Sequence, residues 1–177
     1  MTDKLKAQIP GKHEIVTSLD REFARLHLNS CALAAGTPAG VLYQAAAQQR
    51  PSLLTEGPAF SSVGEKLLRS AAIIEQTFGG ITANLWDDPF EWTLPEYLSS
   101  AEAIIEYLDE VEATRQRAFQ SFTDDACLQL NVVIPSGESV TLISLLRATL
   151  RRAAVCQGEA LGLLKRLSGI SPSGFII

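Results

Sequence analysis

The stretch SVGEKLLRSAAIIEQTFGG, from Ser62 to Gly80, carries the clearest fold signal in the chain. Ser62 and Glu65 have the spacing of a capping box, in which each side chain satisfies a free N–H group of the first helical turn. Apolar residues then recur every three or four positions, as the buried face of a helix requires. The stretch therefore predicts an amphipathic helix over 62–79 that ends at Gly79-Gly80.

Three further stretches repeat this helical period: 12–35, 99–122 and 141–168. The first and the last are each followed directly by a glycine, which is common at the end of a helix. The middle one opens on Ser99, and Glu102 follows three residues later as in a capping box. These stretches are expected to form long helices with one apolar face each.

Two shorter signals lie between the long helices. Thr37-Pro38 fits a helix start, with threonine as the cap and proline in the first turn, and predicts a short helix over 38–48. Residues 128–134 have β character, and the turn signal at 135–138 follows them. At most a small β-hairpin is therefore expected before the last helix.

Four capped amphipathic helices without an alternating βαβ pattern predict an all-α fold, a four-helix bundle. The connections from the first long helix to the second, and from the second to the third, exceed what an up-and-down bundle needs. Long crossover loops are therefore expected. We assign residues 1–11 to a mobile tail, 12–169 to the bundle and 170–177 to a C-terminal tail.

Composition excludes several classes of protein. The 177 residues suit one domain, and a net charge of −5 argues against a nucleic-acid-binding surface. Two His and three Cys are too few for a dense zinc or disulfide framework, and free thiols fit a reducing cytoplasm. Residues 26–49 carry no charged side chain, but glycine, proline and amides interrupt them, so packed helices are expected there, with no membrane span.

Two segments resemble the DinB family of helical bundles, which includes YfiT-like metal-dependent hydrolases and thiol-dependent transferases. Residues 62–71 are similar to the family's Ser-Ile-Gly-Glu-x-Leu-x-His opening of helix two, and 145–167 to its His-x-x-x-His-Arg-Gly-Gln segment of helix four. The Pro-Ser-Gly-Glu turn at 135–138 stands where the family often has a Pro-x-Gly turn. The resemblance covers residues 12–168 and implies a DinB-like four-helix bundle.

The resemblance also implies where a metal site would lie. The family binds a divalent metal through three His, one on helix two and an i, i+4 pair on helix four, and these positions correspond to Arg69, Arg152 and Cys156. A guanidinium has no lone pair to offer and repels a cation. We therefore expect no metal, no cofactor and no catalytic residue at these positions.

Two interpretations of the altered positions stay open. Glu159 lies seven residues after Arg152, and Glu65 lies one turn before Arg69, so an Arg–Glu cluster can replace the metal. Alternatively, the two Arg hold a small anionic ligand by bidentate hydrogen bonds. In both cases Arg69, Arg152, Cys156 and Glu159 should converge between the two helices as a vestigial metal site.

The remaining chemical side chains give weaker signals. Cys156 fits a small core residue better than a nucleophile, which needs a base and a lowered pKa. His13 and His27 fall ~21 Å apart along one helix and cannot share a metal. Each fits a solvent-facing or core-edge histidine better than a catalytic base.

The leading functional prediction is a non-enzymatic binding or interaction protein that has lost its metal site. One alternative is a thiol-dependent transferase or hydrolase of the DinB/YfiT kind with an altered site. The other is a structural homodimer without a ligand. A mean hydropathy of +0.12 is high for helices that need one apolar stripe, and the surplus predicts an exposed apolar surface and a homodimer.

Overall fold

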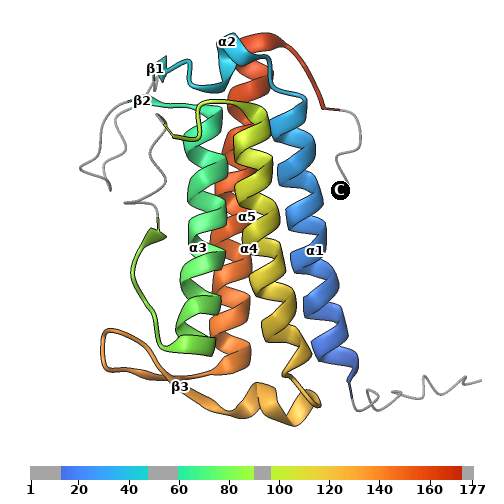
Figure 1. Ribbon diagram of the computed structural model, residues 1–177, viewed down its shortest axis with the longest axis vertical. Coiled ribbons are helices and arrows are strands. Elements are labelled where there is room, and N and C mark those ends of the chain that lie inside the picture. Colours follow the sequence, from blue (N-terminus) through green and yellow to red (C-terminus); the bar gives the residue numbers. More distant parts are fainter. Residues whose placement is uncertain (1–12, 48–59, 90–96, 173–177) are drawn as a thin grey trace, which may run out of the picture.

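The computed structural model describes residues 13–47, 60–89 and 97–172, and this part of the chain is all-α (Figure 1). Two-stranded antiparallel pairs accompany the helices, and the pair β3–β4 is the small hairpin predicted before the last helix. The elements are α1 (Glu14–Ala35), α2 (Ala39–Leu42), β1 (Ala46–Ala47), β2 (Phe60–Ser61), α3 (Val63–Ala83), α4 (Ala101–Gln120), the 3-10 helix η2 (Asp125–Gln129), β3 (Asn131–Val133), β4 (Ser139–Thr141) and α5 (Leu142–Ser168). The all-α prediction is confirmed, and the predicted tail over 1–11 lies outside the described residues.

The four long helices lie side by side, with α1 and α5 running in one direction and α3 and α4 in the other (Figure 1). Helix α3 packs along α5 and α4, and α1 packs along α4 and α5. Because α3 and α4 are parallel neighbours, the chain must return along their full length between them. The parallel arrangement of α3 and α4 therefore requires the long connection that the sequence predicts between them. Residues 84–89 are the first residues of this connection.

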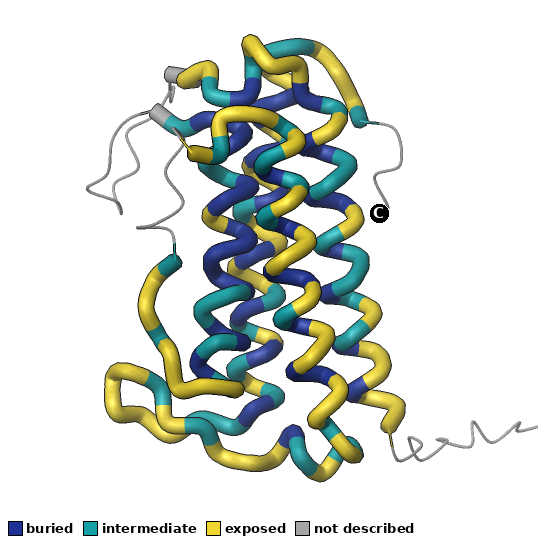
Figure 2. The backbone as a smooth tube through the Cα atoms, in the orientation of Figure 1, coloured by how far each residue is buried: buried dark blue, intermediate teal, exposed yellow. Residues whose placement is uncertain are grey.

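Aromatic rings from three helices meet in the core. Phe23 of α1, Phe78 of α3 and Phe119 of α4 have ring centroids 5.3 to 5.9 Å apart, in edge-on or tilted arrangements. The side chains of Phe23 and Phe78 are fully buried. Figure 2 shows the buried residues on the facing sides of the helices, so one core runs through the molecule.

Small residues and hydroxyl groups bring α3 and α5 close together. The Ser70 hydroxyl donates to the carbonyl oxygen of Ala153 at 2.9 Å, and the hydroxyl oxygens of Thr77 and Thr149 lie 2.8 Å apart. All four residues are buried. Hydrogen bonds to a neighbouring helix satisfy polar groups that would otherwise be costly to bury.

A side chain that is distant in the sequence caps the start of α1. No side chain caps α1 locally, but the carboxylate of Asp125 accepts from the backbone N–H groups of Ile15 and Val16 at 3.1 and 2.9 Å. The start of α1 is therefore fixed by the 3-10 helix that precedes the hairpin. Burial raises the pKa of Asp125, but these hydrogen bonds outweigh it and lower the pKa below its usual value.

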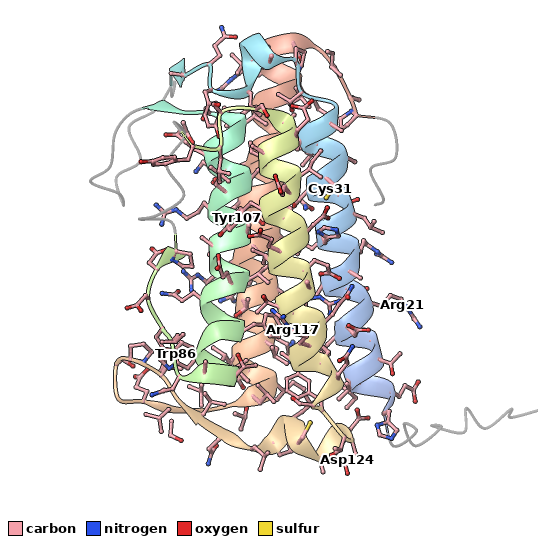
Figure 3. The ribbon with its side chains drawn as sticks, viewed as in Figure 1. Arg21, Cys31, Trp86, Tyr107, Arg117 and Asp124 are labelled. Atoms are coloured by element: carbon pink, nitrogen blue, oxygen red, sulfur yellow. The ribbon has the colours of Figure 1, made fainter. Side chains whose placement is uncertain are left out.

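Two predicted helix boundaries are wrong. Helix α3 continues through Gly79-Gly80 to Ala83 and ends at Asn84, which adopts a left-handed conformation with φ 55°. A Cβ atom on Gly80 would lie 2.3 Å from the indole of Trp86, so this glycine makes room for the ring (Figure 3). The short helix expected over 38–48 is reduced to Ala39–Leu42, and residue 48 lies outside the described residues.

Gly80→Ala should lower the stability of the protein, although alanine favours a helix. Displacing the Trp86 indole should cost ~1–3 kcal/mol, as overpacking does, against a helix-propensity gain of about 1 kcal/mol. The matched control is Gly158→Ala in α5, where a Cβ meets nothing within 4 Å and stability should rise. Urea unfolding followed by tryptophan emission, with Trp92→Phe in both variants so that Trp86 is the remaining tryptophan, measures both effects. An equal increase in stability in Gly80→Ala and Gly158→Ala would show that the Trp86 ring does not pack against Gly80.

The uncharged stretch 26–49 is divided between the end of α1, a turn at Gly36 and the short α2, up to where the description stops at residue 47. No helix in the described part of the chain combines the length and the apolar character that crossing a membrane needs.

Candidate functional site

The positions predicted from the DinB resemblance lie on one face formed by α3 and α5. Burial first, and then the charge of Glu159, raise the pKa of the Cys156 thiol, while the charges of Lys66, Arg69 and Arg152 act to lower it. The charges of all these groups therefore reach the half-buried thiol. Arg69, Arg152 and Glu159 are exposed, so this face is a surface cluster around one cysteine.

The ion pairs on this face differ from the expected Arg–Glu pairs. Glu159 pairs with Lys66 at 2.6 Å, and Arg69 pairs with Asp88 at 3.4 Å. Glu65 accepts from the backbone N–H and the hydroxyl of Ser62, at 2.7 and 2.9 Å, as the capping box predicted. Exposed pairs of this kind contribute at most about 1 kcal/mol to stability.

Cys156 is poorly suited to nucleophilic catalysis. Its pKa is raised, so the thiol stays protonated at neutral pH, whereas a reactive cysteine needs the thiolate. The same applies to Cys31, whose pKa is raised to about 11 by burial and by the charges of Asp109 and Glu112. Burial and Glu159 outweigh the three cations around Cys156, and the charged groups that act on Cys31 are carboxylates, so neither thiol is activated.

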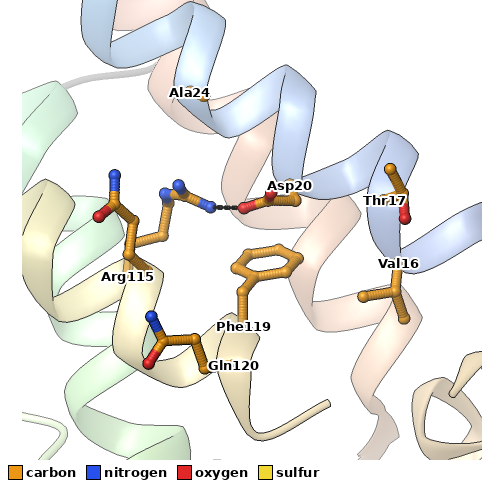
Figure 4. Close-up of a pocket in the computed structure, with 8 residues that line it drawn as sticks. Val16, Thr17, Asp20, Ala24, Arg115, Phe119 and Gln120 are labelled. Carbon is orange, nitrogen blue, oxygen red and sulfur yellow. Dashed lines mark hydrogen bonds and ion pairs between the residues drawn. The ribbon is translucent and has the colours of Figure 1, made fainter. Parts of the chain in front are cut away.

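A buried charged cluster that the sequence did not reveal joins α1 and α4. Arg115 donates from Nε and Nη2 to the two carboxylate oxygens of Glu112, each at 2.7 Å, and from Nη1 to Asp20 of α1 (Figure 4). Its side chain is 3% exposed, and its guanidinium lies 5.0 Å from the centre of the Phe119 ring. Gln116 also donates to Glu112 at 2.8 Å.

The charged groups of this cluster stabilise one another in their ionised forms. Burial alone would raise the pKa of Glu112, but the hydrogen bonds from Arg115 and Gln116 outweigh it and lower the pKa. Burial would lower the pKa of Arg115, and its carboxylate partners Glu112 and Asp20 raise it instead. A pocket of about 380 Å³ opens beside the cluster. Because all three guanidinium nitrogens are engaged, this pocket attracts an anion only weakly.

A second group of polar side chains lies further along the same α1–α4 interface. His27 and Cys31 are one turn apart on α1, and Asp109 faces them from α4. His27 Nε2 lies 3.3 Å from Asp109 Oδ1 and 3.7 Å from Cys31 Sγ. The i, i+4 spacing of His27 and Cys31 was readable in the sequence, but their partner on another helix was not.

A cleft of about 380 Å³ lies between α1 and α5. Leu26, Leu150 and Ala154 give it an apolar lining, and the side chain of Gln157 is fixed in it by hydrogen bonds to the carbonyl oxygen of Leu26 at 2.7 Å and to the Ser30 hydroxyl at 2.8 Å. The other residues that line the cleft are Glu22, Arg25, Asn29, Arg147 and Arg151.

Three arginines therefore surround an apolar lining. Arg147 and Arg151 stand one helical turn apart on α5 and are exposed, so both guanidiniums can reach the same ligand. Arg25 comes from α1, where it lies 3.9 Å from Glu22. The two residues that the resemblance singled out on α5, Arg152 and Cys156, are not among the cleft residues.

The described chain thus offers an exposed α3–α5 face, two polar groups along α1–α4 and a basic cleft between α1 and α5. The cleft is the one of these that combines a volume suited to a small molecule with cations available for binding. Comparison of the chain with family models, with curated proteins and with solved structures gives no match.

Proposed function

We propose that this chain is a DinB-like four-helix bundle that acts as a non-enzymatic binding protein, and that it takes up a small anion with an apolar body. Four long helices packed lengthwise, the capping box at Ser62 and the hairpin before α5 support the bundle assignment. Arg69, Arg152 and Cys156, at the positions where the family has its three His, support a role other than metal-dependent catalysis.

The observation that carries the proposal is the basic cleft between α1 and α5. Arg25, Arg147 and Arg151 set three positive charges against the one carboxylate of Glu22, in a chain whose net charge is −5. A guanidinium binds a carboxylate or a phosphate through two parallel hydrogen bonds. Local positive charge on an acidic protein is therefore suited to an anionic ligand.

The size and lining of the cleft define the rest of the ligand. A volume of about 380 Å³ lies within the range of small-molecule sites, roughly 300–1,000 Å³. Leu26 and Leu150 offer apolar contacts, and burying each methylene group of a ligand contributes about 0.8 kcal/mol. A carboxylate or phosphate attached to a short alkyl or aromatic body satisfies both features.

Calorimetric titration with octanoate tests this proposal, with octanol and octylamine as neutral and cationic probes of the same length. Octanoate should bind, and octanol should bind about 10- to 100-fold more weakly, because it lacks the charge-assisted hydrogen bonds. Octylamine should bind more weakly still. Equal affinity for the three probes, or no binding of octanoate, would overturn the proposal.

Variants then locate the site. The double variant Arg147→Gln/Arg151→Gln should weaken octanoate binding by about 10- to 100-fold, because both guanidiniums are lost from the cleft. Arg166→Gln is the matched control, since Arg166 is an exposed arginine of α5 that does not line the cleft. Unchanged affinity in the double variant, or an equal loss in the control, would place the binding elsewhere and reject the cleft.

The homodimer, the reducing cytoplasm and the alternative of a thiol-dependent enzyme stay predictions from the sequence. Leu28 of α1 and Val155 of α5 are more than half exposed and support a search for a dimer contact. The raised pKa of Cys156 and Cys31 gives the thiol-dependent alternative less support than the binding protein has.

A further inference from the structure

Three side chains of different kinds converge at the α1–α4 interface. His27 and Cys31 lie on adjacent turns of α1, and Figure 3 shows Cys31 beside α4, the helix that carries Asp109. One ligand atom from each residue lies within 4.8 Å of the other two. Imidazole nitrogen, thiolate sulfur and carboxylate oxygen are the atoms that bind zinc in proteins.

Two of the three distances between ligand atoms are close to those of a tetrahedral metal site. With Zn–N and Zn–O of about 2.0–2.1 Å and Zn–S of about 2.3 Å, a tetrahedron separates nitrogen from oxygen by ~3.3 Å and sulfur from nitrogen by ~3.6 Å. His27 Nε2 lies 3.3 Å from Asp109 Oδ1 and 3.7 Å from Cys31 Sγ. The Asp109 side chain is 63% exposed, so its carboxylate has room to turn toward the sulfur.

The charges along this interface also favour a cation. Asp20, Asp109 and Glu112 bring three carboxylates, and Arg115 is the guanidinium that pairs with two of them. These three negative groups and one positive group carry a net charge of −2. The Cys31 thiolate that binds the ion adds one more negative charge, so a divalent ion between His27, Cys31 and Asp109 reduces the net charge of these groups from −3 to −1.

The cluster is less suited to a cysteine nucleophile. Cys31 Sγ lies 3.7 Å from His27 Nε2 and 3.8 Å from Nδ1, so the sulfur faces the edge of the ring between the two nitrogens. A general base would instead align one ring nitrogen with the thiol and turn the other toward the carboxylate. A metal ion bound to Nε2 lies along the lone pair of that nitrogen, so the imidazole must turn about its side-chain bonds for Nε2 and Sγ to hold the same ion.

We propose that His27, Cys31 and Asp109 form a site for a tetrahedral divalent transition-metal ion, with zinc the best fit and water as the fourth ligand. Thiolate and imidazole ligands select zinc over magnesium and calcium. Binding releases the Cys31 thiol proton to the buffer, because the thiolate is the ligand. The site lies on a different helix pair from Arg69, Arg152 and Cys156, and it does not depend on the anion cleft.

Titration of the untagged full chain with Co²⁺, after treatment with a chelator, tests the site. Tetrahedral Co²⁺ with a thiolate ligand gives strong visible d–d bands and a sulfur-to-metal charge-transfer band in the near ultraviolet. Both should grow to saturation at one equivalent and disappear when Zn²⁺ is added. A flat titration, or bands typical of octahedral Co²⁺ without charge transfer, would overturn the proposal.

Cysteine variants identify the sulfur ligand. Cys31→Ser should remove the charge-transfer band, whereas Cys156→Ser, which changes another half-buried thiol, and Cys127→Ser should keep it. Asp109→Asn should weaken Zn²⁺ binding by at least about tenfold while leaving the far-ultraviolet circular dichroism unchanged, since Asp109 is exposed. A band that survives in Cys31→Ser or is lost in Cys156→Ser, or an unchanged affinity in Asp109→Asn, would reject this set of ligands.

Discussion

Arg115→Met should lower the free energy of unfolding by about 3–5 kcal/mol, the loss typical of breaking a buried ion pair. The variant removes the three donors that Glu112 and Asp20 use, and it leaves the buried carboxylate of Glu112 without its cation. Methionine fills much of the same volume, so packing accounts for little of the loss. Urea unfolding followed by far-ultraviolet circular dichroism at neutral pH measures the change.

Two further variants separate the charge from other effects. Arg117→Met removes an exposed arginine two residues further along α4 and should change stability by less than about 0.5 kcal/mol. Glu112→Met added to Arg115→Met should restore much of the loss, because no buried carboxylate then lacks its partner. A loss below about 1 kcal/mol in Arg115→Met alone would show that the cluster does not hold α1 to α4.

The difference in stability between the wild type and Arg115→Met should become smaller in acid. The folded-state pKa of Glu112 is depressed from the ordinary value of 4.5, mainly because the bonds from Arg115 outweigh burial. Stabilisation by this pair is therefore fully present above pH 4.5 and is lost as the pH falls through the lower folded-state pKa. The wild type should approach Arg115→Met in stability over that acid range.

The starts of α3 and α4 were predictable because their signals are local. Ser62 and Glu65 form the capping box that the sequence indicated, and α3 begins at the next residue, Val63. The start of α4 was predicted within two residues, since Ser100 caps the helix by accepting from the N–H of Ala103. The end of α3 was not predictable from its own sequence, because Gly80 is explained by a ring that follows the helix.

The chemically important contacts were not predictable because they join distant parts of the chain. Glu112 and Arg115 form an i, i+3 pair that is typical of a solvated helix face, and only the packing of α1, with Asp20 95 residues away, buries them. His27 is only partly buried, which agrees with the core-edge interpretation, but its partner Asp109 comes from another helix and had no signal in the sequence.

Helix phase decides which arginines of α5 can share a ligand. Successive residues of a helix point about 100° apart, so neighbours in sequence face different sides. Arg151 lines the α1–α5 cleft together with Arg147, whereas the charge of Arg152 acts on Cys156 near α3. One of the two interpretations of the altered positions placed an anion between Arg69 of α3 and Arg152 of α5. The basic cleft is instead lined by Arg147 and Arg151, and Arg151 points about 100° away from Arg152 around the helix.

Phe78→Ala should lower the free energy of unfolding by about 3–5 kcal/mol, because it opens a cavity where α1, α3 and α4 meet. The Phe78 ring is fully buried and lies 5.3 and 5.7 Å from the ring centres of Phe23 and Phe119. Both of those rings lose a partner, and neighbouring helices can close the space only in part. Urea unfolding at constant pH gives the change in free energy.

The matched control is Phe122→Ala, since Phe122 also contacts Phe119, with a centroid distance of 5.1 Å, but is only half-buried. Its loss should be clearly smaller than that of Phe78→Ala, because solvent can fill the space. An apolar cavity shaped like the missing ring should also bind benzene, as buried apolar cavities of that kind do. Benzene should therefore raise the melting temperature of Phe78→Ala and leave Phe122→Ala unchanged. Equal losses in the two variants would show that the aromatic cluster is not the centre of the core.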